Sequence, residues 1–107
     1  MAMVQVAVAL PVDGLFTYGV PDSMQLEPGH AVVVPFGARR LTGYVIEEAT
    51  EAVPRMRMVQ RLADPTPAFD QRQLSFFRWI ASYYHASLGE VIATALPVAY
   101  RQKSRRV

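Results

Sequence analysis

The feature that most constrains this 107-residue sequence is a change in its hydrophobic period near residue 64. Before that point apolar residues recur every second position, as in "MVQVAVAL" at residues 3–10, which is the period of a half-buried strand. After Asp70 they recur three and four positions apart, which is the period of an amphipathic helix. The segment "DPTP" separates the two patterns with two prolines. We therefore expect a sheet followed by helices.

The first part of the chain predicts about five short strands. Pro35 is expected to end the third strand or to place it at an edge, because proline has no N–H for the ladder. Gly43 indicates a bulge or a close approach of two backbones. The hairpin tip is expected at "GARR", residues 37–40. The expected strands are 3–10, 15–20, 30–36, 41–49 and, as a possible fifth, 55–64.

The remainder of the chain predicts two helices. Asp70 is a plausible N-cap for the first, and the "SFFRWIASYYH" stripe is expected to pack on the sheet. The second helix is expected at 88–97, closed by Pro97. Strands followed by helices indicate an α+β domain with a small, partly closed barrel, OB-like as first choice and SH3-like as second. The helical face expected to be buried comprises Leu74, Phe77, Ile80, Ala81 and Tyr84.

The composition excludes several classes of protein. The chain has no cysteine, which rules out disulfides and thiolate metal sites. No segment approaches the roughly 20 apolar residues of a membrane helix, and the N-terminal residues read as a strand rather than a signal peptide. The net charge of +2 is concentrated in the tail "RQKSRRV", since the first 100 residues hold more acidic than basic side chains. Nucleic-acid binding would therefore use a local site, and the preponderance of arginine suits contacts to phosphates or bases.

The sequence does not contain the constellation of an independent enzyme. It has no phosphate-binding loop and no dinucleotide fingerprint. His30 and His85 lack a suitably spaced serine or carboxylate, and each is interpreted as a surface or helix-flank histidine. The acidic cluster of Glu47, Glu48 and Glu51 is interpreted as a solvated strand end. We expect no catalytic residue, no metal site and no cofactor in this chain.

Aromatic residues near the turns of the β part are more informative. Phe16, Tyr18, Phe36 and Tyr44 can stack on bases or can belong to the core. Alternation favours the core for Tyr18 and Tyr44 and leaves both roles open for Phe36.

The turn that follows Phe36 adds a second indication. Gly37 lets a ligand approach the backbone closely, and Arg39, Arg40 and Arg57 could contact phosphates. The residues by themselves thus indicate a small α+β module with a possible nucleotide or nucleic-acid site.

Three segments, in order and spacing, resemble the N-terminal domain of the PriA family, the bacterial replication-restart helicases also called primosomal protein N′. They are "FTYGVP" at 16–21, "VPFG" at 34–37 and "WIASYY" at 79–84, and the resemblance extends from about Val4 to about Pro97. It implies a 3′-DNA-end-binding domain at 1–97, with a β part at about 1–63 and a helical part at about 67–97. Residues 98–107 would then be a basic linker or tail.

The resemblance also implies a function. Such a domain binds the 3′ end of the nascent leading strand at a stalled or abandoned replication fork and is not itself catalytic. The parent family carries an ATP- and magnesium-dependent motor and a zinc region, which are expected outside this chain. The implied location is the bacterial cytoplasm, at the nucleoid.

The pocket of the family is carried over to Phe16, Gly37 and Arg57. Arg55 and Arg61 stay open as alternatives to Arg57, because the alignment crosses a loop of variable length. Thr17 stands where some members have an aspartate, and it can donate or accept a hydrogen bond but brings no charge. Roles for Tyr18, Phe36, Arg39 and Arg40 in contacting DNA are our own inference from the sequence.

Two other classes of function remain open. The domain could be a protein-interaction module for single-strand-binding protein or another primosome protein. Phe16 and Phe36 would then be exposed, and Arg57 would be held in an ion pair. Alternatively, it could be an RNA-binding OB module, which a preference for a 2′-hydroxyl would reveal.

Overall fold

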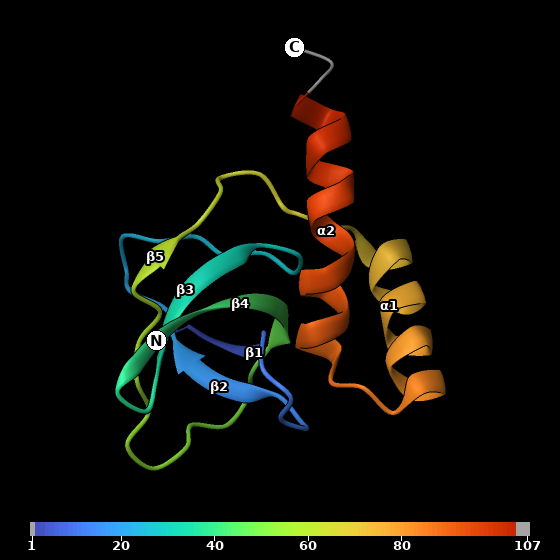
Figure 1. Ribbon diagram of the computed structural model, residues 1–107. Helices are drawn as coiled ribbons and strands as arrows, with labels where there is room; N and C mark the ends of the chain where they lie inside the picture. Colours follow the sequence, from blue (N-terminus) through green and yellow to red (C-terminus); the bar gives the residue numbers. More distant parts are fainter. Residues whose placement is uncertain (1, 105–107) are drawn as a thin grey trace.

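A computed structural model describes the backbone of residues 2–104 and the side chains of residues 2–96. The β part comes first, and two helices lie together on one side of it (Figure 1). The elements are β1 (Met3–Val8), β2 (Phe16–Gly19), β3 (Ala31–Phe36), β4 (Arg39–Glu48), β5 (Arg61–Leu62), α1 (Gln71–Tyr84) and α2 (Leu88–Ser104). This order confirms the α+β class.

The five strands form one antiparallel sheet in the order β2-β1-β4-β3-β5. The segment that leads into β5 also touches β2, because the Gly19 N–H donates to the Arg57 carbonyl and the Val59 N–H to the Gly19 carbonyl, both at 2.9 Å. This segment therefore contacts β2 at one edge of the sheet and β3 at the other. The sheet is curled and nearly closed, as expected of a small OB-like domain.

Every strand differs from expectation at one end or both, and two of these differences matter for the site. The fifth strand is limited to Arg61–Leu62 instead of 55–64. Arg55 has a left-handed φ of 56°, which no strand accommodates, and Met58 forms only an isolated bridge. The fourth strand begins at Arg39, so the hairpin tip is shorter than "GARR".

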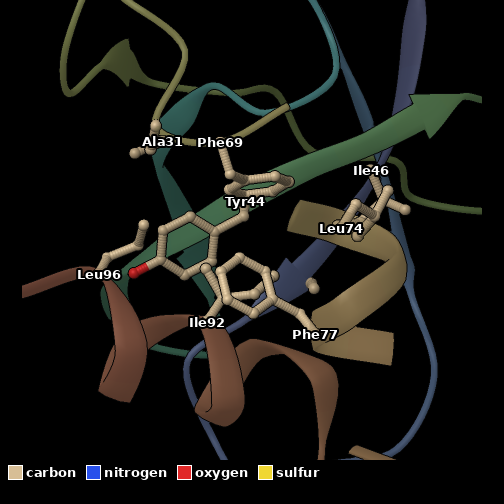
Figure 2. Close-up of a cluster of buried hydrophobic side chains, with 10 residues drawn as sticks. Ala31, Tyr44, Ile46, Phe69, Leu74, Phe77, Ile92 and Leu96 are labelled. Carbon is tan, nitrogen blue, oxygen red and sulfur yellow. The ribbon is translucent and has the colours of Figure 1, made fainter. Parts of the chain in front are cut away.

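The apolar side chains form two clusters on opposite faces of the sheet. One is rich in valine and lies inside the curled sheet, and it includes Tyr18. The other joins the sheet to the helices around Tyr44, Phe69 and Phe77 (Figure 2). Both tyrosines are buried, as alternation predicts. At Gly43, an added Cβ would overlap the Val6 side chain, so the close neighbour is a side chain and not the second backbone that was expected. The register shift between β1 and β4 lies at Gln5 and Val6.

The first helix begins at a pair of reciprocal hydrogen bonds between Asp70 and Gln73. The Asp70 carboxylate accepts from the Gln73 N–H at 2.9 Å while the Gln73 side chain accepts from the Asp70 N–H, which completes a capping box.

The second helix continues to Ser104 and does not end at Pro97, contrary to the prediction. A proline removes one backbone donor from a helix, and the helix here runs on through that position.

The expected burial of the aromatic stripe on α1 is only partly correct. Leu74 and Phe77 are buried, and Ile80 and Ala81 are half-buried. The other aromatic side chains are exposed, because α2 packs against β1 and α1 packs against α2 (Figure 1). The exposed side chains are Phe76, Trp79, Tyr83 and Tyr84, with 57% to 68% of their surface accessible.

In the part of the chain that the structure describes, no helix has the length and apolar content needed to cross a membrane.

Candidate functional site

A hollow of about 380 Å³ opens where β2, the β3–β4 hairpin and the loop before β5 meet. These are three segments far apart in sequence. The predicted residues Phe16, Thr17, Gly37 and Arg57 all line it, as do Tyr18 and Phe36. The remaining lining residues are Leu15, Pro35, Val53, Arg55 and Met56.

Two phenylalanine rings form part of the lining. Phe16 and Phe36 pack edge to face, with ring centroids 5.1 Å apart and an interplanar angle of 84°. Both rings are half-buried against the valine-rich cluster. Each ring is thus fixed by packing on one side and accessible on the other, which is suited to stacking against a planar ligand.

The β3–β4 hairpin turns at Gly37 and Ala38, since Phe36 pairs with Arg39. Gly37 has a φ of +61°, as the first central position of a type II′ turn requires. No protein atom lies within 4 Å of the position that a Cβ on Gly37 would take. The glycine is therefore required by the turn, and the space beside it is open to a ligand.

Two side chains hold the hairpin from across the hollow. The Tyr18 hydroxyl donates to the Pro35 carbonyl and Arg57 Nη1 donates to the Gly37 carbonyl, each at 2.7 Å. Burial raises the pKa of Tyr18 above its ordinary value, and the nearby Arg57 charge partly opposes this. Tyr18 is consequently a neutral donor at physiological pH.

Thr17 has its hydroxyl proton engaged. Its Oγ1 donates to Gln5 Oε1 on the neighbouring strand β1 at 3.2 Å. A hydroxyl has one proton and two acceptor lone pairs. With its proton directed at Gln5, Thr17 Oγ1 retains only acceptor capacity, which is the capacity that a carboxylate would have at this position.

The hollow has a positive rim. Arg55 and Arg57 both line it, and none of its lining residues is acidic. The left-handed backbone of Arg55 is uncommon for a non-glycine residue, and such conformations concentrate at functional sites. Of the three arginines left open by the sequence, Arg57 touches the hairpin, Arg55 shares the lining, and Arg61 lies outside it.

The structure does not bring the other two predicted arginines into this hollow. Arg39 begins β4 opposite Phe36, and Arg40 pairs with Pro35. Arg40 instead lines a second, separate hollow.

The sequence reasoning missed Val53 and Met56 as parts of the site. Both lie in the loop between β4 and β5. Met56 alternates with Arg55 and Arg57 in the sequence, which predicts a strand with Met56 in the core, whereas the structure places it in the lining of the hollow.

The other polar groups considered from the sequence have structural roles. His30 is buried rather than on the surface, because its Nδ1 accepts from the Glu27 N–H at 2.9 Å and its Nε2 lies 3.2 Å from the Pro65 carbonyl. His85 caps α1 in a left-handed conformation. Glu47 pairs with Arg78 at 3.6 Å. Among the described residues, no group of three His, Asp or Glu side chains could hold a metal ion.

Residues 5–97 match the model of the 3′ DNA-binding domain (3′BD) of PriA. The chain belongs to this PriA domain family. The replication restart protein PriA of Haemophilus influenzae is 38% identical to it over 104 residues, which cover 94% of this chain and 14% of that protein. The corresponding proteins of Treponema pallidum and Rickettsia felis are 33% and 31% identical, over 89% and 94% of this chain and 16% of each protein.

The family resemblance inferred from the three sequence motifs is thereby confirmed. The chain is a DNA-binding domain of the PriA replication-restart family. It spans about a seventh of the length of the Haemophilus relative, and the helicase motor region is not within it.

Proposed function

We propose that the hollow captures the 3′-terminal nucleotide of a DNA strand, as found at the nascent leading strand of a stalled or abandoned replication fork. The observation that carries this proposal is the open space beside Gly37, which adjoins an accessible ring, a hydroxyl acceptor and an arginine. Each of these three groups can contact one part of a terminal nucleotide.

The terminal base stacks on the accessible side of Phe16, a contact worth roughly 1–3 kcal/mol. Its 3′-hydroxyl donates to Thr17 Oγ1, whose proton is held by Gln5. The Arg57 guanidinium, already hydrogen-bonded to the hairpin, contacts the sugar or the phosphate on the 5′ side of the nucleotide. An internal nucleotide carries a phosphate in place of the hydroxyl and is excluded by its size and by the lack of a donor at Thr17.

Stacking tolerates all four bases, so the proposed site reads the end of the strand and not its sequence. The footprint is one or two nucleotides. Affinity is therefore weak in isolation, and the tethered remainder of a full-length protein would add avidity. In that setting the domain would direct an ATP-driven helicase to abandoned forks in the bacterial cytoplasm, at the nucleoid.

The proposal is tested by fluorescence anisotropy with a 5′-labelled oligonucleotide that ends in either a 3′-hydroxyl or a 3′-phosphate, at one fixed salt concentration. The hydroxyl end should bind several-fold more tightly. Equal binding of both ends would show that only the backbone is contacted, and end capture would be rejected. A third oligonucleotide with a terminal ribose tests the RNA alternative, since a preference for the 2′-hydroxyl would favour it.

A second function, binding of a partner protein, is favoured by the exposed face of α1. Phe76 stacks on Trp79 with centroids 6.4 Å apart, and Trp79 stacks on Tyr83 at 5.4 Å. Exposed aromatic side chains of this kind are enriched at protein interfaces. The hollow itself does not have the features expected of a peptide groove, since Phe16 and Phe36 are half-buried and Arg57 forms no ion pair with any described residue.

Single-strand-binding protein and other primosome proteins are the proposed partners of this face. Trp79 is the one tryptophan of the chain, so its emission reports on the face directly. Titration with single-strand-binding protein should change that emission, and Tyr83→Ala should weaken the interaction. Phe16→Leu, in the hollow, is the control that should not. Emission that is unaffected by the partner would remove this second function.

A further inference from the structure

We propose that the hollow around Arg40 and Arg61 is a second DNA subsite, which binds the phosphates of the strand immediately 5′ of the captured nucleotide. The hollow measures about 540 Å³ and most of its lining is polar. Its lining residues are Val33, Arg40, Leu41, Thr42, Gln60 and Arg61. This proposal rests on the proposed function of the first hollow.

The sheet register places the two arginines on one exposed face. Val33 is paired with Thr42 on β4 and with Arg61 on β5, so these three side chains form a row across three strands. Pro35, two residues further along β3, is paired with Arg40. Residues paired across a sheet, and residues two apart on a strand, share a face. Arg40 and Arg61 therefore flank β3 from opposite sides of the same face.

The two guanidinium groups are available. Both side chains are exposed, and neither has an ion pair or a side-chain hydrogen bond with another residue that the structure describes. The lining contains no acidic residue to neutralise them. Gln60 and Thr42 add amide and hydroxyl donors, which suit phosphate oxygens. Two unpaired arginines beside neutral donors are the composition of a phosphate site.

The two hollows share no lining residue, but both adjoin β3. Pro35 lines the first hollow and Val33 lines the second, and they lie two residues apart on β3. That separation is about 6.6 Å along the strand, whereas stacked nucleotides repeat every ~3.4 Å. A strand whose 3′ end occupies the first hollow thus needs only about two nucleotides to reach Arg40 and Arg61. The direction of the DNA strand follows from this arrangement. Its 3′ end lies in the first hollow, and its 5′ side lies over β3 and β5.

The test compares a thymidine dinucleotide with a thymidine octanucleotide, both carrying a 5′ label and a free 3′-hydroxyl, by anisotropy. The double variant Arg40→Gln/Arg61→Gln should bind the octanucleotide about tenfold more weakly. Its log–log salt slope should be smaller by about 1.4, from two phosphate contacts on a single strand. Binding of the dinucleotide should not change. Arg72→Gln, an exposed arginine on α1, is the matched control and should behave as the wild type.

The outcomes separate the two proposals. Wild-type affinity of the double variant for the octanucleotide would overturn the second subsite, as would an equal loss for both lengths, which would indicate a general effect of charge. Failure of end capture would be seen in a different measurement. The wild type would then bind octanucleotides with a 3′-hydroxyl and with a 3′-phosphate equally. Thermal unfolding of both variants establishes that the sheet is intact.

Discussion

Replacement of Thr17 by valine is the most direct test of how the hollow recognises a strand end. Valine has the same shape but lacks the hydroxyl that donates to Gln5 at 3.2 Å. We expect Thr17→Val to remove the acceptor for the 3′-hydroxyl and to leave the walls of the hollow in place. Thr17→Ser retains the hydroxyl and is the matched control.

The magnitude follows from one neutral hydrogen bond, which contributes about 0.5–1.5 kcal/mol. Affinity for a 3′-hydroxyl end should fall roughly 2- to 13-fold. Stability should change little, because the bond to Gln5 is long and only part-buried, and valine favours strands. A loss below about 1 kcal/mol corresponds to less than roughly 4–8 °C in Tm.

The assay is anisotropy with paired oligonucleotides that end in a 3′-hydroxyl or a 3′-phosphate, and the quantity compared is the ratio of the two affinities. Thr17→Val should lower the ratio by weakening the hydroxyl end alone, and Thr17→Ser should preserve it. A ratio that is unchanged in Thr17→Val would refute the acceptor role. So would an equal loss for both ends, since the hydroxyl would then act only through the structure of β2.

Four further outcomes are expected. Arg57→Met should weaken binding equally for all four terminal bases and reduce the salt slope by about 0.7, measured by anisotropy between low and moderate salt. Tyr18→Phe should cost about 1–3 kcal/mol at neutral pH in urea unfolding, from the carbonyl left unpaired. Because burial raises the pKa of Tyr18, the wild type loses stability as pH rises past about 10, so the difference between wild type and this variant should shrink there. Gly37→Ala should destabilise by about 1–2 kcal/mol because its φ is +61°, and it should also weaken DNA binding by occupying the open space. Gly89→Ala should cost about 1–3 kcal/mol in thermal unfolding without a specific loss for 3′-hydroxyl ends, because a Cβ there would overlap the backbone of β1.

Periodicity was sufficient to predict the sheet, the two helices and the N-cap at Asp70. These features depend on neighbours in sequence or on the alternation of two faces. The burial of α1 was not predictable in the same way. Which side of a helix is covered depends on where the next helix packs, and α2 leaves Trp79 and Tyr83 in solvent. The close contact of Gly89 with β1 is equally a property of the assembled domain.

The residues of the site also divide into those that local sequence predicts and those that only the assembled domain places. Phe16 and Gly37 could be proposed from motifs, since an aromatic on a short strand and a glycine in a two-residue turn each have a local signature. Whether Arg55, Arg57 or Arg61 faces the hairpin depends on the path of an irregular loop. That path is set by the left-handed conformation of Arg55 and the bridge to Gly19, for which the sequence contains no pattern.

The segment from Arg57 to Leu62 joins the two edges of the sheet, and it also carries two of the three arginines of the proposed DNA path. Arg57 faces the hairpin where this segment meets β2, and Arg61 lies four residues later, where it meets β3. The distance between the hollow that binds the 3′ end and the hollow that binds the phosphates is thus set by the length of the chain that closes the fold. Inserting one residue there would turn the side chains of β5 to the opposite face of the sheet, so DNA affinity and closure of the domain should be gained or lost together.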